Sequence, residues 1–296
     1  MITTILKGFC MGAADIIPGV SGGTIALILG FYTRLIDAIR SFDGTLLRYL
    51  YQGDPGAAAR RIDLVFLLSL GFGIVMALLF FTHVIPLPIL LHTHPEFVYG
   101  LFFGLLIASV GFLIRALEYI EPRDGLWLVL GAVAGYWIVG LTPIHTPEEP
   151  WFIFLSGSIA ICAMILPGIS GSFMLLILKK YAYLLDAFSR LDLGVLVPFG
   201  LGAAAGLLLF SRFLAWLLRN FYRPTFLVIT GVLMGSLWII WPFQSRTYLN
   251  IEGKSHLVRS MPVWPREFDE TTVAVLFLIL LGMAIMITIN SFVKRT

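Results

Sequence analysis

The chain alternates long apolar stretches with short polar ones along its 296 residues. About 20 apolar residues are enough for a helix to cross a bilayer. The uninterrupted apolar stretches predict transmembrane helices at about 64–85, 97–117, 125–142, 194–218, 226–242 and 272–293. Two further apolar stretches, about 8–40 and 151–180, are broken in the middle. The longest polar stretches are 41–63 and 243–271.

The two broken stretches carry the same motif. The first reads Pro18-Gly19-Val20-Ser21-Gly22-Gly23, and the second reads Pro167-Gly168-Ile169-Ser170-Gly171-Ser172. Proline removes a backbone donor and glycine costs about 1 kcal/mol per helical position, so both motifs predict a break in a helix. Residues 12–39 align with residues 161–188 without gaps, with 13 of 28 positions identical. A two-fold internal repeat follows, because the offset of 149 is close to half the chain length.

Composition places the chain in a membrane. Hydrophobic residues make up 59% of it, charged residues only 12%, and the mean hydropathy is +0.94, whereas soluble domains carry about 25% charged residues. The net charge of +3 does not suggest nucleic-acid binding. Cys10 and Cys162 lie inside apolar segments and are interpreted as packing residues. We assign no metal, no cofactor and no ATP-binding loop.

Each half reads as one broken segment followed by three apolar helices, and two topologies are open. If the broken segments dip into the membrane and return, the halves are inverted, and Lys and Arg divide 13 to 7 in favour of the N-terminal side. If they cross, the repeats are parallel and the division is 6 to 14. Charge does not decide between them. We favour dipping hairpins with cytoplasmic termini, because the motif leaves two short helical arms and the ends of 41–63 are rich in arginine.

The predicted fold is therefore an all-α integral membrane protein that forms a single transmembrane domain over residues 1–296. Its repeats are 1–146 and 147–296, and we expect them to be inverted. Each consists of a re-entrant helical hairpin plus three transmembrane helices.

The residues after each break predict an anion site. The first N–H groups of a helix lack internal partners, the helix dipole adds positive potential there, and glycines let a ligand approach the backbone. The phosphate-binding candidates are Ser21, Gly22, Gly23, Thr24, Ser170, Gly171 and Ser172, and the breaks themselves are Pro18, Gly19, Pro167 and Gly168. The alternative is that the motif only kinks a packed hairpin.

Two charged residues are further candidates. Asp15 lies three residues before Pro18 inside an apolar segment, where a carboxylate is costly and usually functional. We expect it to carry a coupling proton or bind a coupling cation; the alternative is that it caps a local turn. Arg212 interrupts an apolar run from Leu207 to Leu218 and is a candidate partner for a phosphate, although such arginines more often snorkel to the interface.

The run from Gly12 to Thr24 and the shorter run from Leu166 to Phe173 resemble a bacterial membrane family once called a domain of unknown function. That family is now assigned as polyprenyl-phosphate (undecaprenyl-phosphate) transporters, and the resemblance covers essentially the whole chain. It implies a multi-pass plasma-membrane protein with re-entrant hairpins and an inverted repeat. One departure is that Lys179-Lys180 stands in place of Gly30-Phe31, so the end of the second hairpin is expected to differ.

The resemblance implies a flippase that returns undecaprenyl phosphate from the outer to the inner leaflet, for reuse in peptidoglycan and other envelope polymers. Its partners are the polyprenyl phosphate, membrane lipid and a proton or sodium as coupling ion. Helix N-termini inside a membrane serve a channel or exchanger for a small inorganic anion equally well, and this is the alternative function. An enzyme is not expected, because no nucleophile–base set is evident.

Overall fold

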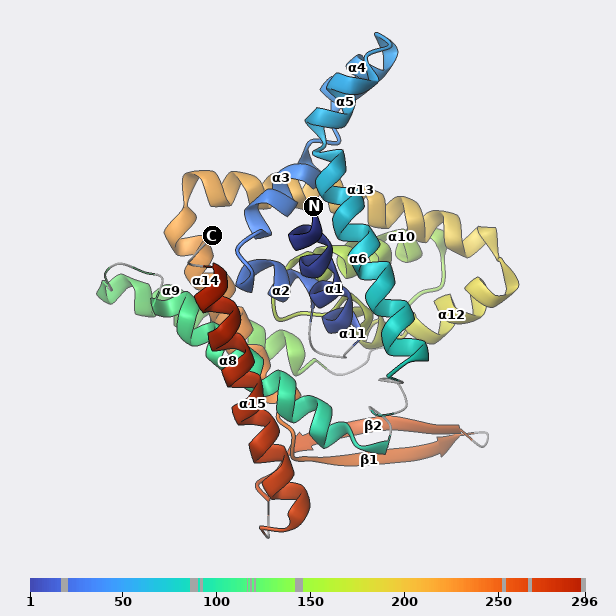
Figure 1. Ribbon diagram of the computed structural model, residues 1–296. Coiled ribbons are helices and arrows are strands. Elements are labelled where there is room, and N and C mark those ends of the chain that lie inside the picture. The colour runs from blue at the N-terminus through green and yellow to red at the C-terminus, as the bar shows by residue number, and fades with distance from the viewer. Residues whose placement is uncertain are drawn as a thin grey trace.

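The computed structural model describes residues 1–16, 21–85, 90, 93–115, 117, 119, 121–141, 146–251, 254–265 and 268–293 (Figure 1). The helices of the first half are α1 (Ile2–Asp15), α2 (Gly22–Ile28), α3 (Tyr32–Arg40), α4 (Gly44–Tyr51), α5 (Pro55–Arg61), α6 (Leu64–His83), α8 (Pro95–Arg115) and α9 (Pro122–Val139). Those of the second half are α10 (Pro150–Ile165), α11 (Gly171–Ile177), α12 (Tyr181–Arg190), α13 (Leu193–Asn220), α14 (Tyr222–Ser236), the short 3-10 helix η1 (Leu237–Ile240) and α15 (Glu270–Val293).

The protein is a helical, multi-pass membrane protein. Within the described ranges, five helical segments are long and apolar enough to cross a bilayer: α6, α8, α13, α14 with η1, and α15. The predicted helix at 125–142 corresponds to α9, which opens with the charged pair Arg123 and Asp124 and is not one of the five. Large apolar side chains on α6, α13 and α15 are exposed, as expected of surfaces that face lipid.

The two long polar stretches fold outside the bundle. Residues 41–63 form α4 and α5, which project from one end of the molecule (Figure 1). Asp43 caps α4 by accepting the amides of Thr45 and Leu46 at 3.0 and 3.1 Å. The second stretch contains the antiparallel strands β1 (Gln244–Ile251) and β2 (Lys254–Pro262), with a register shift between Thr247 and Tyr248. The expected helical membrane fold is confirmed, and this hairpin adds one two-stranded sheet to it. A polar segment outside the bilayer can satisfy its backbone by strand pairing.

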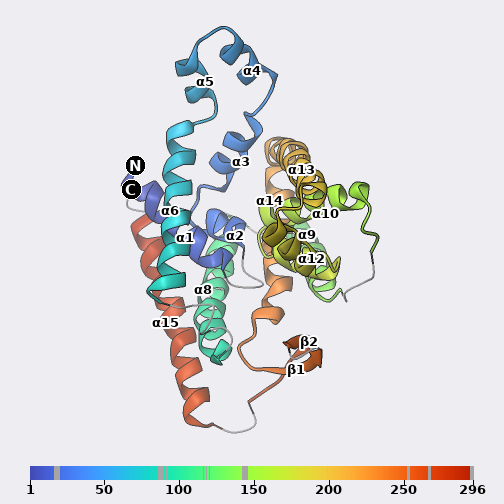
Figure 2. The ribbon, with the colours of Figure 1, turned by 90° about the vertical axis from the view of Figure 1, so that its right-hand side faces the viewer.

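Four helix pairs carry most of the packing between the described helices. α1 packs against α6 and α10 against α13, so each broken segment contacts the first long helix of its own half. The other two pairs join the halves: α8 packs against α15, and α9 against α14. Figure 2 shows α1, α6, α8 and α15 on one side of the molecule, with α9, α10, α12 and α13 grouped on the other side.

Glycines allow these helices to approach closely. A Cβ on Gly104 of α8 would collide with the carbonyl oxygen of Ile279 on α15, and one on Gly235 of α14 with that of Ala132 on α9. The G-x-x-x-G spacings at 100–104 and 231–235 therefore mark helix contacts, as such spacings do in membranes. The largest buried cluster lies where α1–α3 meet α6, α8, α13 and α14.

Candidate functional site

The first hairpin turns between α1 and α2. Residues 17–20, which include the predicted breakers Pro18 and Gly19, lie outside the described residues. Ser21 caps α2, since its Oγ accepts the amide of Thr24 at 3.3 Å. The amide of Gly22 donates to Oδ1 of Asp15 at 2.6 Å, so the end of α1 is tied to the start of α2.

The second hairpin interrupts its helix at the predicted place. α10 ends at Ile165 and α11 begins at Gly171, with Pro167 buried in the turn between them. Gly168 has φ +88°, a left-handed conformation that favours glycine. A Cβ there would also lie 2.8 Å from Oγ of Ser236 and 3.0 Å from Cα of Leu233. Glycine is therefore required at this position for two independent reasons.

The two hairpins touch each other, although they lie about half a chain apart in sequence. Ser21 Oγ donates to the carbonyl oxygen of Leu166 at 3.2 Å, and the amide of Gly168 donates to Oγ1 of Thr24 at 2.9 Å. The hydroxyl of Tyr32 donates to the carbonyl oxygen of Ile165 at 3.1 Å. The two motifs thus form one polar centre inside an apolar bundle.

The two halves of this polar centre differ in what they offer a ligand. Ser21 and Thr24 are fully buried, and their hydroxyls already bind protein groups. In the second half the Ser170 side chain does not cap α11; its hydroxyl forms a hydrogen bond with Ser172 at 2.8 Å, and Ser172 is exposed. The accessible polar groups therefore belong to the start of α11.

Asp15 makes a capping contact, but with Gly22 beyond the break and not with the local turn before the break that the sequence left open as its alternative role. The contact spans the break, because the carboxylate reaches an amide seven residues further along the chain. A negative group thus lies at the N-terminal end of α2, where the helix dipole favours it. Its counterpart in the second half is Met164, so α11 has no such carboxylate at this position.

Lys179 and Lys180 keep the turn that Gly30 and Phe31 make in the first half. Lys179 has φ +52° and Gly30 has φ +70°, so the backbone conformation is the same, contrary to the expected difference. Lys180 is buried; its Nζ donates to the carbonyl oxygen of Thr146 at 3.1 Å and lies over the ring of Tyr183. Sequence comparison of the repeats marked this pair only as a mismatch and did not identify a buried cation.

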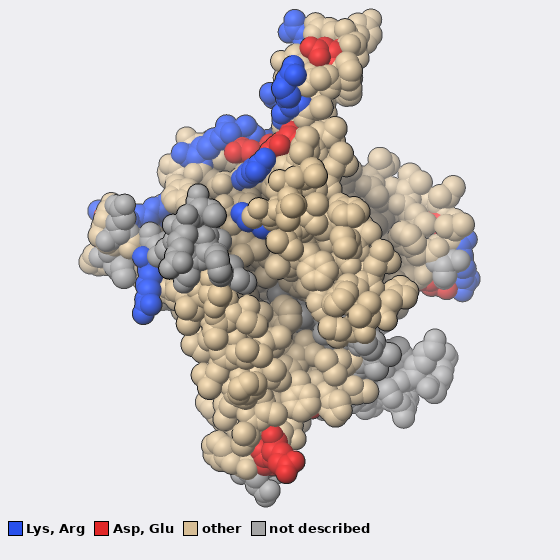
Figure 3. All heavy atoms as spheres, in the orientation of Figure 1, with Lys and Arg blue, Asp and Glu red and all other residues tan. Residues whose placement is uncertain are grey.

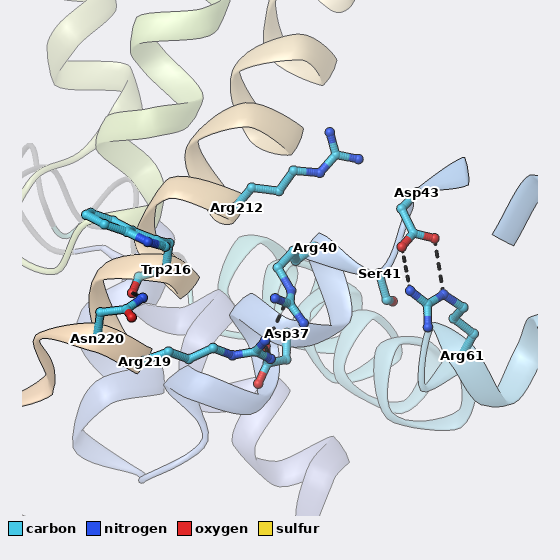
Figure 4. Close-up of a pocket in the computed structure, with 9 residues that line it drawn as sticks. All are labelled: Asp37, Arg40, Ser41, Asp43, Arg61, Arg212, Trp216, Arg219 and Asn220. Atoms are coloured by element: carbon cyan, nitrogen blue, oxygen red, sulfur yellow. Dashed lines mark hydrogen bonds and ion pairs between the residues drawn. The ribbon is translucent and has the colours of Figure 1, made fainter. Parts of the chain in front are cut away.

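Arg212 lies in a different place from the hairpin residues. It lines a cavity of about 860 Å³ at the end of α13, and none of the described hairpin residues lines that cavity (Figure 4). The Arg212 guanidinium donates to the carbonyl oxygen of Phe42 at 3.3 Å. The structure therefore groups Ser21, Thr24, Ser170 and their neighbours, and places Arg212 with other arginines.

Comparison with known proteins agrees with this architecture. A family model described as undecaprenyl phosphate translocase-like matches residues 11–258. A polyprenyl-phosphate transporter of Vibrio cholerae serotype O1 is 38% identical over 302 aligned residues, which cover 99% of this chain and 97% of the relative. A polyprenyl-phosphate transporter of Staphylococcus aureus is 31% identical over 258 residues, 80% of this chain and 85% of the relative.

No solved structure shows significant similarity to the chain. The family match extends over most of the sequence and includes both broken segments with their shared motif. The chain therefore belongs to the undecaprenyl phosphate translocase-like family, whose names describe transporters and not enzymes.

Proposed function

We propose that the protein returns undecaprenyl phosphate, or a related polyprenyl phosphate, from the outer to the inner leaflet of the bacterial plasma membrane. The lipid carrier is then available again for peptidoglycan and other envelope polymers. Family membership over most of the chain is the observation that carries this proposal. Moving the head group unaided is costly because a charge must lose its water, whereas the polyprenyl tail stays in lipid throughout.

The polar centre at the hairpins is the proposed crossing point for the phosphate. It supplies hydroxyl and amide donors inside an apolar bundle, which is the chemistry that a phosphate needs there. We expect the phosphate head group to contact the second hairpin first, because Ser172 at the start of α11 is exposed. In this proposal Ser21, Gly22, Gly23 and Thr24 join the site from the other half once the hydrogen bonds that now occupy Ser21, Gly22 and Thr24 open.

Asp15 is the proposed coupling residue. Its carboxylate holds the amide of Gly22, so this amide is not available to an anion while Asp15 is charged and in place. Protonation of Asp15, or its capture by sodium, would release the amide and remove a negative charge from the path. An anionic head group and a cation would then favour each other's binding, which is the basis of coupling.

Two inverted repeats, residues 1–146 and 147–296, are the proposed architecture. Corresponding contacts support it: a Cβ on Gly8 of α1 would collide with the carbonyl oxygen of Leu70, and one on Gly157 of α10 with that of Phe199. Gly157 is the repeat counterpart of Gly8, and the two helix pairs are α1–α6 and α10–α13. Rocking of one repeat against the other is the mechanism that such folds use for alternating access.

The third helices of the repeats are exchanged in this architecture. α15 of the second half packs on α8 of the first, and α9 of the first half packs on α14 of the second. The Gly104–Ile279 and Gly235–Ala132 approaches are therefore counterparts of each other. Each repeat is completed by a helix that the other half provides.

The termini are proposed to be cytoplasmic. Lys and Arg gather at the end of the molecule that carries α3, α5 and the end of α13, while the opposite end, where α15 begins, displays acidic residues (Figure 3). α1 begins and α15 ends toward the basic end (Figure 1). The positive-inside rule assigns that end to the cytoplasm.

Leaflet exchange in proteoliposomes tests the proposed function. Labelled undecaprenyl phosphate in the outer leaflet should become inaccessible to an added phosphatase faster than in empty liposomes, and an imposed proton or sodium gradient should change the rate. Ser170→Ala and Ser172→Ala should each slow exchange, while Ser156→Ala, whose hydroxyl binds the Phe152 carbonyl within α10, should not. Flux of inorganic anions without lipid exchange would support the channel alternative instead.

A further inference from the structure

The cavity at the cytoplasmic end of α13 is a second concentration of charge, separate from the hairpins. Its lining comes from α3, the turn into α4, the end of α5 and the C-terminal part of α13, and its volume is about 860 Å³. The lining residues are Asp37, Arg40, Ser41, Asp43, Arg61, Arg212, Trp216, Arg219 and Asn220 (Figure 4). We call this cavity the arginine vestibule.

The ion pairs of the vestibule leave positive charge uncompensated. Asp37 is shared, with Arg219 at 2.9 Å and Arg40 at 3.7 Å, while Asp43 is held by Arg61. Four guanidinium groups thus face two carboxylates, which leaves two positive charges. The hydrogen bond from Arg61 lowers the pKa of Asp43 to about 2, so this carboxylate stays ionised at neutral pH.

Arg212 is the arginine whose charge is most available. Among the described residues no carboxylate pairs with it, and its guanidinium donates to the backbone carbonyl of Phe42. Arg219 is half exposed in spite of its ion pair with Asp37. A guanidinium presents several N–H donors in a planar fork, which suits phosphate oxygens better than a single ammonium does.

We propose that the arginine vestibule binds a phosphate monoester head group, with Arg212 and Arg219 as its direct ligands. A monoester carries nearly two negative charges at neutral pH, which matches the two positive charges of the vestibule. A phosphodiester such as phosphatidylglycerol carries one. The vestibule therefore favours a polyprenyl phosphate over the bulk anionic lipids around it.

The position of the vestibule indicates what this binding is for. This role of the vestibule rests on the proposed transport function. It lies at the basic end of the molecule, beside the surface that we assign to the cytoplasm (Figure 3). A head group that has passed the hairpins would rest there before it leaves into the inner leaflet. The vestibule is thus a release site, and the hairpin centre is the crossing site.

Binding to the full-length protein in detergent tests the vestibule directly. The probe is geranylgeranyl phosphate, a short polyprenyl phosphate, with geranylgeraniol as its uncharged match. Arg212→Gln and Arg219→Gln should each weaken binding of the phosphate about tenfold, which corresponds to the loss of one charge-assisted hydrogen bond. Arg190→Gln is the control, since Arg190 pairs with Asp186 at 3.0 Å on α12, outside the vestibule.

Competition distinguishes the sources of phosphate. Inorganic phosphate should displace the probe from the wild type, while phosphatidylglycerol at the same concentration should displace much less. Equal displacement by phosphatidylglycerol would overturn the proposal, because it would reveal a general anionic surface. Unchanged affinity in the Arg212→Gln Arg219→Gln double variant, with an unchanged thermal unfolding midpoint, would overturn it as well.

Transport separates this inference from the proposed function. In leaflet exchange, Arg212→Gln should raise the lipid concentration needed for half-maximal rate in the cytoplasmic-to-outer direction, and Arg190→Gln should not. If the wild type exchanges lipid and Arg212→Gln leaves this concentration unchanged, the vestibule proposal fails while the function stands. If the wild type does not exchange lipid, the function fails, and the binding experiment still decides the vestibule.

Discussion

A single carboxylate makes the two hairpins chemically unequal. In the first, Asp15 and Ser21 bind the amides at the start of α2, while in the second Met164 replaces the acid and the Ser170 hydroxyl turns to Ser172. The shared motif predicts two equal anion sites, because it contains the same small and hydroxyl residues twice. The difference arises from one residue outside the motif and from side-chain orientation.

Replacement of Asp15 by asparagine tests its coupling role. Asparagine can accept the Gly22 amide as aspartate does, but it neither ionises nor binds a proton at these pH values. Leaflet exchange by Asp15→Asn should therefore lose its dependence on pH, measured in proteoliposomes at mildly acidic and neutral pH. Asp192→Asn is the control, since Asp192 caps α13 through the amide of Gly194 at 2.9 Å. If leaflet exchange by Asp15→Asn still depended on pH, Asp15 would act only as a helix cap and not as the coupling residue.

At the scale of elements, the helix pairs depend on glycines placed opposite backbone carbonyls. On α13 a Cβ at Gly202 would collide with the carbonyl oxygen of Phe154 on α10, whereas a Cβ at Gly200 would meet nothing within 4 Å. Two glycines separated by one residue thus have opposite roles: one is a contact and the other faces open space. Sequence alone does not separate them, because both lie in the same apolar run.

Alanine at these two glycines should have opposite effects on stability. Gly202→Ala forces α10 and α13 apart and should cost about 1–3 kcal/mol, lowering the thermal unfolding midpoint in detergent by roughly 5 °C. Gly200→Ala should leave the midpoint unchanged or raise it slightly, since alanine favours helix. Equal midpoints for the two variants would contradict this packing of α10 against α13.

The turn after the second hairpin offers a stabilising substitution. Lys179 has φ +52°, where a side chain costs about 1–2 kcal/mol and glycine costs little. Lys179→Gly should therefore raise the unfolding midpoint by a few degrees. Lys180→Gly should lower it, because Lys180 is buried and binds the Thr146 carbonyl. A loss of stability in Lys179→Gly would show that the lysine side chain matters more than the strain.

At the scale of the whole molecule, charge and shape divide the protein into two ends. The basic end carries the α4–α5 projection, and the other end carries the start of α15 (Figures 1 and 3). If the hairpins dip and return, these ends lie on opposite sides of the membrane. If they cross, the projection and the start of α15 lie on the same side.

Cysteine labelling distinguishes these topologies. In a variant without Cys10 and Cys162, Gln52→Cys on the exposed α4–α5 projection should be protected from a membrane-impermeant maleimide in intact cells. Phe268→Cys, at an exposed position before α15, should be labelled. Labelling of both cysteines, or of neither, would exclude the inverted arrangement. Permeabilised cells provide the control, since both should then react.

The sequence predicted the broken segments and five of the membrane helices, because each is encoded by residues near one another in the chain. It did not predict the arginine vestibule, in which Arg219 meets Asp37 across 182 positions. It listed Arg212 with the hairpin residues because this arginine interrupts an apolar run, whereas the structure places it in the vestibule. Contacts of this kind depend on how helices from opposite halves assemble, which local pattern does not contain.

The exchange of α9 and α15 sets the order in which the molecule can be completed during synthesis. α8 ends at Arg115, but the helix that covers its glycine face begins only at Glu270, so it leaves the ribosome much later. Until α15 is made, the glycine face of α8 lacks the helix that covers it. A chain that stops before residue 270 therefore lacks the α8–α15 contact between its halves. The contact between α8 and α15 can therefore form only after both halves have been synthesised.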